Sequence, residues 1–253
     1  MKKLIAANWK MNKNIEESIS FIKEFKKLIE NIRDVEIVIC PPFTALQAVS
    51  NELKGSNIRL GAQNMHFEDA GAYTGEISPL MLKDAGCEYA ILGHSERRNF
   101  FNEDNALINK KIIAALAHGI KPILCVGEDL EQRNNGKANN VIEKQLKNCL
   151  KYVKENEMPK INIAYEPIWA ISRGNPAHKA ATAQEAEDAH KFIRCVLAGI
   201  FDESQAKSIR LIYGGSMKPD NAKELLSMPN IDGGLVGNAS LTAKSFADTL
   251  NTF

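Results

Sequence analysis

Short runs of apolar and β-branched residues alternate with longer amphipathic stretches from one end of the chain to the other. A short run of this kind is typical of a strand that is buried on both faces. The runs cover residues 3–7, 36–40, 58–62, 89–92, 122–126, 161–165, 209–213 and 233–236. The pattern therefore predicts eight strands.

The stretches between these runs have a helical period. Apolar residues recur at spacings of three and four, as in Ile15, Ile19, Ile22, Phe25 and Ile29, or in Ala186, Ala189, Ile193, Val196 and Ile200. Such spacing places them on one face of a helix that packs against a core. Each predicted strand is thus followed by a predicted helix.

Eight strand–helix units in 253 residues, with no Pro/Gly/Ser-rich linker between them, predict a single α/β domain over residues 1–253. The expected architecture is one closed (βα)8 barrel of parallel strands. The alternative is an open, doubly wound sheet. That sheet would be expected to carry a glycine-rich turn after its first strand. Here the first strand is followed by the polar sequence NWKMN at 8–12.

The charge balance removes several function classes. The chain has 32 basic and 31 acidic side chains, a formal net charge of +1. A chain so close to neutral has no excess positive charge to attract nucleic acid or an anionic membrane. The longest apolar run is residues 112–117, whereas a membrane span needs roughly 20 residues. We expect neither nucleic acid nor a membrane as a partner.

The five cysteines are scattered, without a C-x-x-C pair or a histidine at metal-ligand spacing. They are Cys40, Cys87, Cys125, Cys149 and Cys195. An odd, unpaired set predicts a reduced, cytoplasmic protein without a structural metal. Cys125 ends the fifth strand, and we expect it to be a packed small residue and not a nucleophile.

The residues that follow the strands surround one mouth in a parallel barrel. Polar and glycine residues stand at five of these positions. They are Asn8 and Lys10 after the first strand, His94 after the fourth, Glu166 after the sixth, Gly214, Gly215 and Ser216 after the seventh, and Gly237 and Asn238 after the eighth. We therefore expect these residues, far apart in sequence, to converge on one site.

Taken singly, each of these residues has an ordinary interpretation. Lys10 could be a solvated lysine, and Glu166 could be a loop carboxylate. His94 could simply enter a helix that is capped by Ser95. The glycines at 214 and 215 could do no more than connect a strand to a helix, although they also let backbone N–H groups approach an anion.

Together, the residues have one chemical logic. Glu166 would be a base that removes a proton beside a carbonyl group, and His94 and Asn8 would donate hydrogen bonds to the oxyanion that develops. Lys10 would add positive charge, and the glycine turn would hold an anionic group. The set predicts proton transfer in a small phosphorylated substrate, a reaction that requires no metal and no organic cofactor.

Seven sequence motifs resemble those of the triosephosphate isomerases over essentially the full chain. The motifs are NWKMN at 8–12, GAQN at 61–64, GAYTGE at 71–76, GHSERR at 93–98, AYEPIWAI at 164–171, YGGS at 213–216 and DGGLVG at 232–237. The resemblance implies the interconversion of dihydroxyacetone phosphate and D-glyceraldehyde 3-phosphate through an enediolate, in glycolysis and gluconeogenesis. Glu166 would then be the base, neutral His94 the electrophile and Lys10 a substrate ligand, with Glu96 orienting the network.

The resemblance also implies a phosphate site beneath a lid around residues 167–179. The phosphate ligands would be the backbone N–H groups of Ser172, Ser216, Gly237 and Asn238. The lid would include Pro167, Ile168, Trp169, Ala170, Ile171, Ser172, Arg173 and Gly174. Ile171 and Leu235 would cover Glu166, and burial between aliphatic side chains would raise its basicity. Tyr213 and Ser216 would latch the closed lid, without which the enediolate could lose its phosphate.

The chain departs from the family pattern twice, both times on the phosphate side. After Ile171 the family usually continues Gly-Thr-Gly-Lys, whereas this chain has the longer SRGNPAHK at 172–179. Asn238 stands where the family typically has a second glycine, and we expect it to tolerate a positive φ there. The loop at 71–76 implies a homodimer in which Thr74 reaches Asn8 and Lys10 of the partner subunit.

Two other functions stay open from the sequence alone. One is a different phosphosugar enzyme, such as an aldolase that forms a Schiff base on Lys10. The other is a barrel that binds phosphorylated ligands without turning them over.

Overall fold

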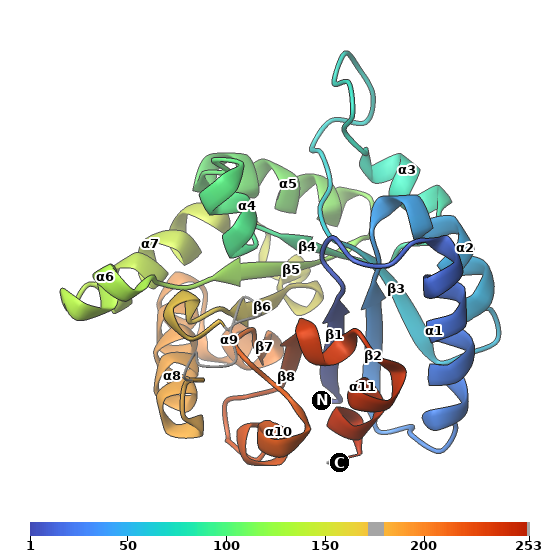
Figure 1. Ribbon diagram of the computed structural model, residues 1–253. Coiled ribbons are helices and arrows are strands. Elements are labelled where there is room, and N and C mark those ends of the chain that lie inside the picture. The colour runs from blue at the N-terminus through green and yellow to red at the C-terminus, as the bar shows by residue number, and fades with distance from the viewer. Residues whose placement is uncertain (172–179, 252–253) are drawn as a thin grey trace.

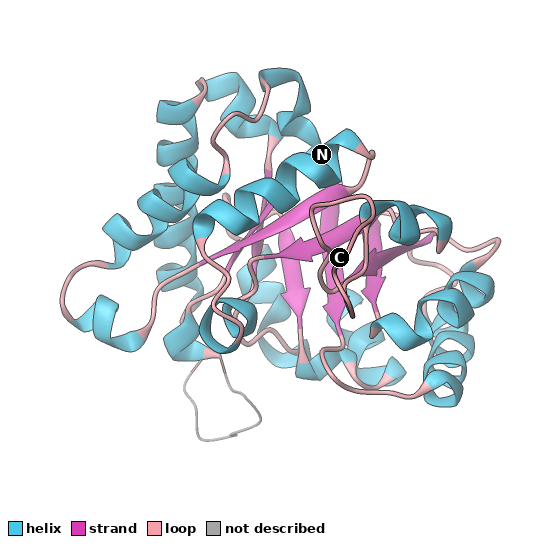
Figure 2. Cartoon of the chain, turned by 90° about the horizontal axis from the view of Figure 1, so that it is seen from above, coloured by secondary structure: helices cyan, strands magenta, loops and turns pink. Residues whose placement is uncertain are grey.

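The computed structural model of the chain describes residues 1–171 and 180–251, and in this part eight parallel strands close into a barrel. Each strand pairs with its neighbours in the sequence, and β8 pairs with β1 to complete the ring. Helices surround the strands on the outside (Figures 1 and 2). The predicted α/β barrel is confirmed, and the open sheet is excluded.

The strands lie within one residue of their predicted bounds. They are β1 (Lys3–Asn8), β2 (Val35–Cys40), β3 (Ile58–Ala62), β4 (Tyr89–Leu92), β5 (Lys121–Val126), β6 (Asn162–Tyr165), β7 (Arg210–Tyr213) and β8 (Gly233–Val236). Asn8 therefore belongs to the first strand and ends it.

The helices occupy the amphipathic stretches between the strands. The α-helices are α1 (Ile15–Leu28), α2 (Leu46–Leu53), α3 (Pro79–Asp84), α4 (Ser95–Phe100), α5 (Asn105–Ala117), α6 (Leu130–Asn134), α7 (Ala138–Cys149), α8 (Ala183–Ile200), α9 (Glu203–Ser208), α10 (Pro219–Leu226) and α11 (Ala243–Leu250). Short 3-10 turns are η1 (Phe43–Ala45), η2 (Glu155–Lys160), η3 (Ile168–Ala170) and η4 (Asn238–Ser240).

The core has two parts because successive side chains of a strand point to opposite faces. In β1, for example, Leu4 and Ala6 point into the barrel, whereas Ile5 and Ala7 pack against the surrounding helices. All four are fully buried. This two-sided burial explains why the strands read as nearly continuous apolar runs, and it leaves only the strand ends free to carry polar chemistry.

Local hydrogen bonds fix where key helices begin. The Asn14 side chain accepts a hydrogen bond from the Glu17 N–H, and the Glu17 carboxylate accepts one from the Asn14 N–H. Thr182 and Glu185 make the same reciprocal pair at the start of α8. Such capping boxes satisfy backbone donors that a helix leaves open. The start of α8 is thus set by its own residues.

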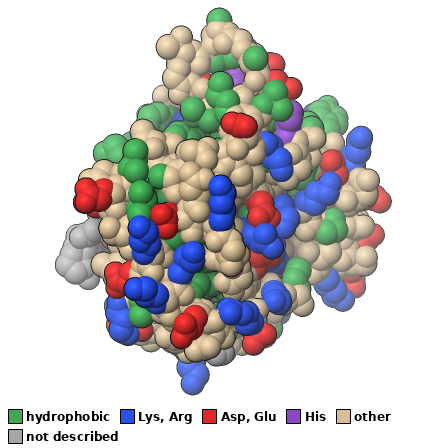
Figure 3. All heavy atoms as spheres, turned by 90° about the vertical axis from the view of Figure 1, so that its right-hand side faces the viewer, with side chains coloured by type: hydrophobic (Ala, Val, Ile, Leu, Met, Phe, Trp, Pro, Cys, Tyr) green, Lys and Arg blue, Asp and Glu red, His purple; other side chains and the backbone are tan. Residues whose placement is uncertain are grey.

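One loop, at residues 64–78 between β3 and α3, extends away from the barrel (Figure 1). Within the loop, the ring of His66 stacks on Phe67 at a centroid distance of 4.4 Å and is tilted against Tyr73 at 4.2 Å. The face of the molecule that carries α1 and α2 mixes acidic and basic side chains (Figure 3). Among the described helices, none is long and apolar enough to cross a membrane.

Candidate active site

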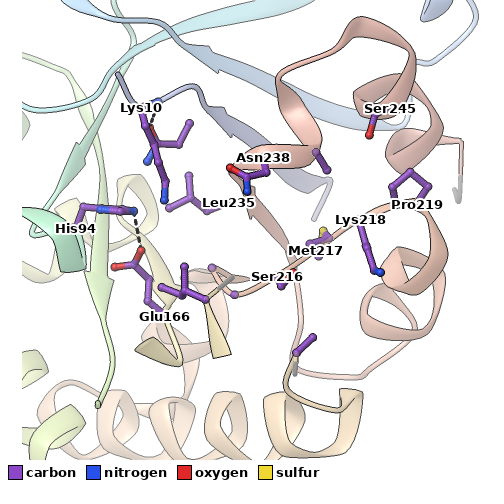
Figure 4. A pocket seen from close by; sticks show the side chains of 17 residues that line it. Lys10, His94, Glu166, Ser216, Met217, Lys218, Pro219, Leu235, Asn238 and Ser245 are labelled. Atoms are coloured by element: carbon purple, nitrogen blue, oxygen red, sulfur yellow. Dashed lines mark hydrogen bonds and ion pairs between the residues drawn. The ribbon is translucent and has the colours of Figure 1, made fainter. Parts of the chain in front are cut away.

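The predicted site residues meet at the carboxyl ends of the strands. Asn8, Lys10, His94, Glu166, Gly214, Gly215, Ser216, Gly237 and Asn238 line one pocket with a volume of about 550 Å³. Figure 4 shows His94 and Glu166 pointing toward each other, with Lys10 and Leu235 beside them and Ser216 and Asn238 across the pocket. Residues separated by most of the chain are therefore neighbours.

Glu166 follows the last residue of β6, and only 1% of it is exposed. Its Oε2 atom accepts a hydrogen bond of 2.8 Å from the Ser95 N–H, 71 positions away in the sequence. Its Oε1 atom lies 2.9 Å from Nε2 of His94. The candidate base is thus held between a backbone donor and the candidate electrophile.

The surroundings of Glu166 act on its pKa in opposite directions. Burial raises the pKa, but His94, the Ser95 N–H and the charge of Lys10 outweigh burial and hold the pKa of Glu166 below its ordinary value. The expectation that burial would make Glu166 a stronger base is wrong for this arrangement. The charges and hydrogen bonds that face the carboxylate stabilise its charged form more than burial disfavours it.

His94 is itself the N-cap of α4, in place of the expected Ser95. Gly93 has a φ of 70° and turns the chain after β4, and His94 then caps the helix with its own Nδ1 atom, which accepts a hydrogen bond of 3.3 Å from the Glu96 N–H. An imidazole nitrogen that accepts carries no proton, so in the neutral ring the hydrogen is on Nε2. Nε2 is the atom that faces Glu166 and the pocket.

Lys10 is held in an uncommon backbone conformation. Its φ of 54° lies in the left-handed region, which few residues other than glycine adopt. The Asn8 side chain accepts from the Lys10 N–H at 3.0 Å, and Gln63 donates to the Lys10 carbonyl at 2.9 Å. The ammonium group lies 2.7 Å from Oε1 of Glu96. Neighbours thus fix both ends of this residue.

Gln63 is a residue of the site whose role the sequence analysis did not assign. It follows β3, and its side chain also donates to the Cys40 carbonyl at the end of β2, at 2.9 Å. It therefore fastens the Lys10 turn to the neighbouring strand ends. The signal was its position inside the GAQN motif, directly after a strand.

The opposite side of the pocket offers backbone donors. In the described part of the chain, the N–H groups of Ser216, Gly237 and Asn238 have no hydrogen-bond acceptor. Unpaired N–H groups at the edge of a pocket suit an anion. Asn238 begins η4 and does not have a positive φ, so the expected left-handed conformation is wrong: the 3-10 turn accommodates its side chain without strain.

The predicted lid lies partly outside the described residues. Pro167, Ile168, Trp169, Ala170 and Ile171 are described, whereas Ser172, Arg173, Gly174 and the remainder of 172–179 are not. Ile171 lines the pocket together with Leu235, as expected for a pair beside Glu166. Whether Ser172 donates to a ligand therefore stays a prediction.

Glu128 and Arg133, to which the sequence analysis assigned no role, contact the start of the predicted lid. Trp169 Nε1 donates to Oε1 of buried Glu128 at 2.7 Å, and the Tyr165 hydroxyl donates to the same oxygen at 3.0 Å. The guanidinium of Arg133 stacks 4.1 Å from the centroid of the Trp169 ring and lies 2.9 Å from Oε1 of Glu185. Glu128 directly follows the β5 strand and its glycine, and that position is the signal that could have identified it.

Two predicted residues do not belong to the pocket chemistry. Thr74 is exposed on the extended loop, outside the pocket of its own chain. Cys125 is fully buried, and burial raises the pKa of its thiol well above the ordinary value. A buried thiol of this kind is a poor nucleophile. No group of three or more His, Cys, Asp or Glu side chains within the described ranges is arranged to hold a metal ion.

Comparisons with known proteins point to one family. The model of the triosephosphate isomerase family matches residues 3–253. The chain is 49% identical to triosephosphate isomerase of Aquifex aeolicus over the whole of both chains, and 49% identical to that of Dictyoglomus turgidum over 99% of each. The crystal structure of triosephosphate isomerase from Bartonella henselae superposes with a TM-score of 0.89 at 39% identity, covering 100% of this chain and 99% of the other.

Proposed function

The chain belongs to the triosephosphate isomerase family, and from this premise we propose how its residues interconvert dihydroxyacetone phosphate and D-glyceraldehyde 3-phosphate. It is an aldose–ketose isomerase, and its reaction is a step of glycolysis. The observation that carries the proposed roles is the contact between Glu166 and His94 in a pocket whose other side presents unpaired N–H groups.

Glu166 is the proposed base. It takes the proton from C1 of dihydroxyacetone phosphate, and the electron pair of the broken C–H bond gives an enediolate. Return of this proton to C2, together with transfer of the O1 hydroxyl proton to O2, yields glyceraldehyde 3-phosphate. His94 donates its Nε2 hydrogen to the carbonyl oxygen, and Asn8 and Lys10 stabilise the developing negative charge.

In this proposal, bound substrate raises the pKa of Glu166. Apart from burial, His94 has the largest effect on the pKa of Glu166, and it lowers that pKa. A substrate carbonyl that accepts the His94 hydrogen bond removes this effect. Burial, which raises the pKa, then has less opposition. In this proposal Glu166 is a stronger base with its substrate in place than in the free protein.

The phosphate group lies on the opposite side of the pocket in this proposal. The N–H groups of Ser216, Gly237 and Asn238 hold it, and Ser172 adds a fourth N–H from the segment around 167–179. That segment covers the enediolate and excludes water, with Tyr213 and Ser216 as its latch. The support is that the Tyr213 hydroxyl is buried and has no hydrogen-bond partner among the described residues.

The test is turnover of glyceraldehyde 3-phosphate in D₂O, with dihydroxyacetone phosphate and methylglyoxal followed together by proton NMR. We expect rapid formation of dihydroxyacetone phosphate that carries deuterium, with little methylglyoxal. Methylglyoxal as the main product would mean that proton abstraction occurs without a closing lid. No turnover would contradict the proposed roles, and trapping of substrate by borohydride would favour the aldolase that uses Lys10.

We propose that two copies of the chain form a homodimer through residues 71–76, each copy being one barrel domain over 1–253 in a reducing cytoplasm. The loop extends from the barrel, and it presents exposed Thr74 and Tyr73, which is 44% exposed. The free state of all five cysteines agrees with such a compartment. Thr74→Arg should shift the sedimentation coefficient to that of a monomer, with Lys2→Arg as the control. A dimeric variant would contradict this interface.

A further inference from the structure

Asn238 brings a side chain to a place where the pocket otherwise presents backbone. It is the first residue of η4, and it lines the same pocket as Ser216, Gly237 and Lys10. Figure 4 shows its carboxamide directed toward the side of the pocket where Lys10 and Leu235 lie, and not toward Ser245 at the outer end. The side chain therefore faces the volume that the substrate occupies.

The carboxamide of Asn238 is available to a ligand. The side chain is exposed, and across residues 1–171 and 180–251 it has no hydrogen-bond partner, as is also true of other exposed asparagines such as Asn31 and Asn135. The fold uses other asparagines to cap helices or join strands, such as Asn14 and Asn162. Asn238 differs from Asn31 and Asn135 because it lines the pocket. An asparagine that faces a pocket and serves no such purpose in the fold is free to bind what enters the pocket.

The backbone of the same residue fixes where the ligand lies. The Asn238 N–H has no acceptor among the described residues, and neither does the N–H of the preceding Gly237. The carboxamide is attached to this backbone through a single methylene, so an anion that accepts from the Asn238 N–H is within reach of the side-chain NH₂ group. That group has two hydrogens to donate and carries no charge.

The charge environment favours a neutral donor at this position. A Cβ atom placed on Gly237 would lie 3.6 Å from Cε of Lys10, so the Lys10 stem runs beside the same turn. The charge of Lys10 lowers the pKa of Glu166, and a second cation nearby would lower it further. A carboxamide has N–H groups to donate to a phosphate and adds no charge that would lower the pKa of Glu166 further.

We propose that the Asn238 side chain is a direct ligand of the substrate's phosphate group and strengthens the preference for phosphorylated over unphosphorylated trioses. This assignment rests on the proposed function, because it places the phosphate on the N–H groups of Ser216, Gly237 and Asn238. It adds a side-chain donor to a site that is otherwise made of backbone. Discrimination follows because an unphosphorylated triose leaves this donor without its acceptor.

The experiment compares Asn238→Ala and Asn238→Asp with the wild-type full-length protein. The measured quantities are kcat and KM for glyceraldehyde 3-phosphate, the inhibition constant of inorganic phosphate, and kcat/KM for unphosphorylated D-glyceraldehyde. Ser245→Ala, at the outer end of the same pocket, is the matched control. Far-ultraviolet circular dichroism and thermal unfolding establish that each variant is folded.

For Asn238→Ala we expect KM and the phosphate inhibition constant to rise about three- to tenfold, the value of one hydrogen bond to a charged group at a partly exposed site. The kcat should stay within about twofold, and kcat/KM for D-glyceraldehyde should not change. Asn238→Asp should raise both constants more than tenfold, because its carboxylate repels the phosphate dianion. Ser245→Ala should match the wild type.

Unchanged KM and phosphate inhibition in Asn238→Ala would overturn the assignment, and so would a lower kcat at constant KM, which would indicate a positioning effect. A wild-type protein that does not isomerise trioses would instead contradict the proposed function. In that case the assignment is still decided by calorimetric binding of inorganic phosphate to the wild type and Asn238→Ala. Equal affinities would refute it, and weaker binding by the variant would support it.

Discussion

The two ends of the barrel each gather charged and polar side chains, but the two groups differ in how completely their polar atoms are paired. At the end of the barrel opposite the mouth, the N-terminal ends of five strands supply a polar cluster. This N-terminal cluster consists of Glu36, Tyr89, Lys121, Asn162 and Arg210. The Arg210 guanidinium donates to the Glu36 carboxylate at 2.5 Å, to Asn162 at 2.8 Å and to the Tyr89 hydroxyl at 3.2 Å. Tyr89 in turn donates to Glu36, and Lys121 donates to Tyr89 at 3.3 Å.

The mouth leaves polar groups without partners in the described part of the chain. These include the buried hydroxyl of Tyr213 at the end of β7, Oε2 of Glu128 after β5, and the N–H groups of Ser216, Gly237 and Asn238 that border the pocket. No buried side-chain atom of the N-terminal cluster is without a hydrogen-bond partner. Unpaired polar groups cost stability in a folded protein.

This difference separates polar groups that support the fold from polar groups that can bind a ligand. A network in which every member is paired is expensive to break and has no capacity left for a ligand. Donors and acceptors that stay open at the mouth are those a substrate and a closing lid can satisfy. Counting unpaired polar groups thus distinguishes the reactive end of the barrel from the supporting end, although both contain a glutamate beside a cation.

The largest expected effect is at the mouth. Glu166→Asp withdraws the carboxylate from the substrate carbon, and we expect kcat to fall by about 10²- to 10⁴-fold, the usual contribution of a positioned base. The KM should change little, because the phosphate contacts remain. Steady-state kinetics test this, with thermal unfolding expected to show a wild-type midpoint. A variant with wild-type kcat would contradict the role of Glu166.

The second largest effect concerns the pH dependence of folding stability, through His190 of α8. His190 is fully buried between Tyr165 and Tyr213, and burial lowers its pKa to about 4, against the partly opposing effects of the Asn230 carbonyl and Asp232. Between pH 6.5 and 4 the unfolded chain binds a proton that the folded chain does not. Stability therefore falls as the pH drops through this window, by roughly 3 kcal/mol for this one group.

His190→Gln tests that slope, because glutamine keeps polar atoms but does not titrate. Urea unfolding at several pH values should show a flatter pH dependence for the variant between pH 6.5 and 4. A parallel slope in both proteins would mean that His190 is already protonated or exposed. Glu36 cannot produce the same signal, because the pKa of its carboxyl is lowered and its contribution is lost only at more acidic pH.

The smallest effect is expected in the N-terminal cluster, where a substitution should lower stability without changing kcat. Removing one partner of a buried ion pair costs about 3 to 5 kcal/mol, and for Arg210→Met we expect about 2 kcal/mol because Tyr89 and Lys121 still contact Glu36. Chemical denaturation measures this loss. The kcat of the folded variant should equal that of the wild type.

A second substitution sharpens the test in the N-terminal cluster. In the double variant Arg210→Met, Glu36→Leu the uncompensated carboxylate is gone, so part of the lost stability should return. A variant of this cluster that lowers kcat while its stability is unchanged would mean that the two ends of the barrel are coupled. The N-terminal cluster would then not be purely structural.

The sequence by itself determined which residues stand at the ends of the strands. Short continuous apolar runs, separated by stretches with a period of three to four, located eight strands to within one residue. Because parallel strands place their carboxyl ends at one mouth, Asn8, Lys10, His94 and Glu166 could be assigned to one site before any distance was known. The strand-end positions also placed Ser216, Gly237 and Asn238 at this site, and the family motifs then added Glu96.

Only the tertiary structure decided how these groups act on one another. The hydrogen bonds from Ser95 to Glu166 and from Gln63 to Lys10 join positions 71 and 53 residues apart, and no local pattern predicts them. The sign of the Glu166 pKa shift depends on the balance between burial and those neighbours, so it was predicted wrongly from burial alone. Periodicity fixes the face on which a side chain lies, whereas charge and hydrogen bonding depend on distances of a few ångströms that packing alone sets.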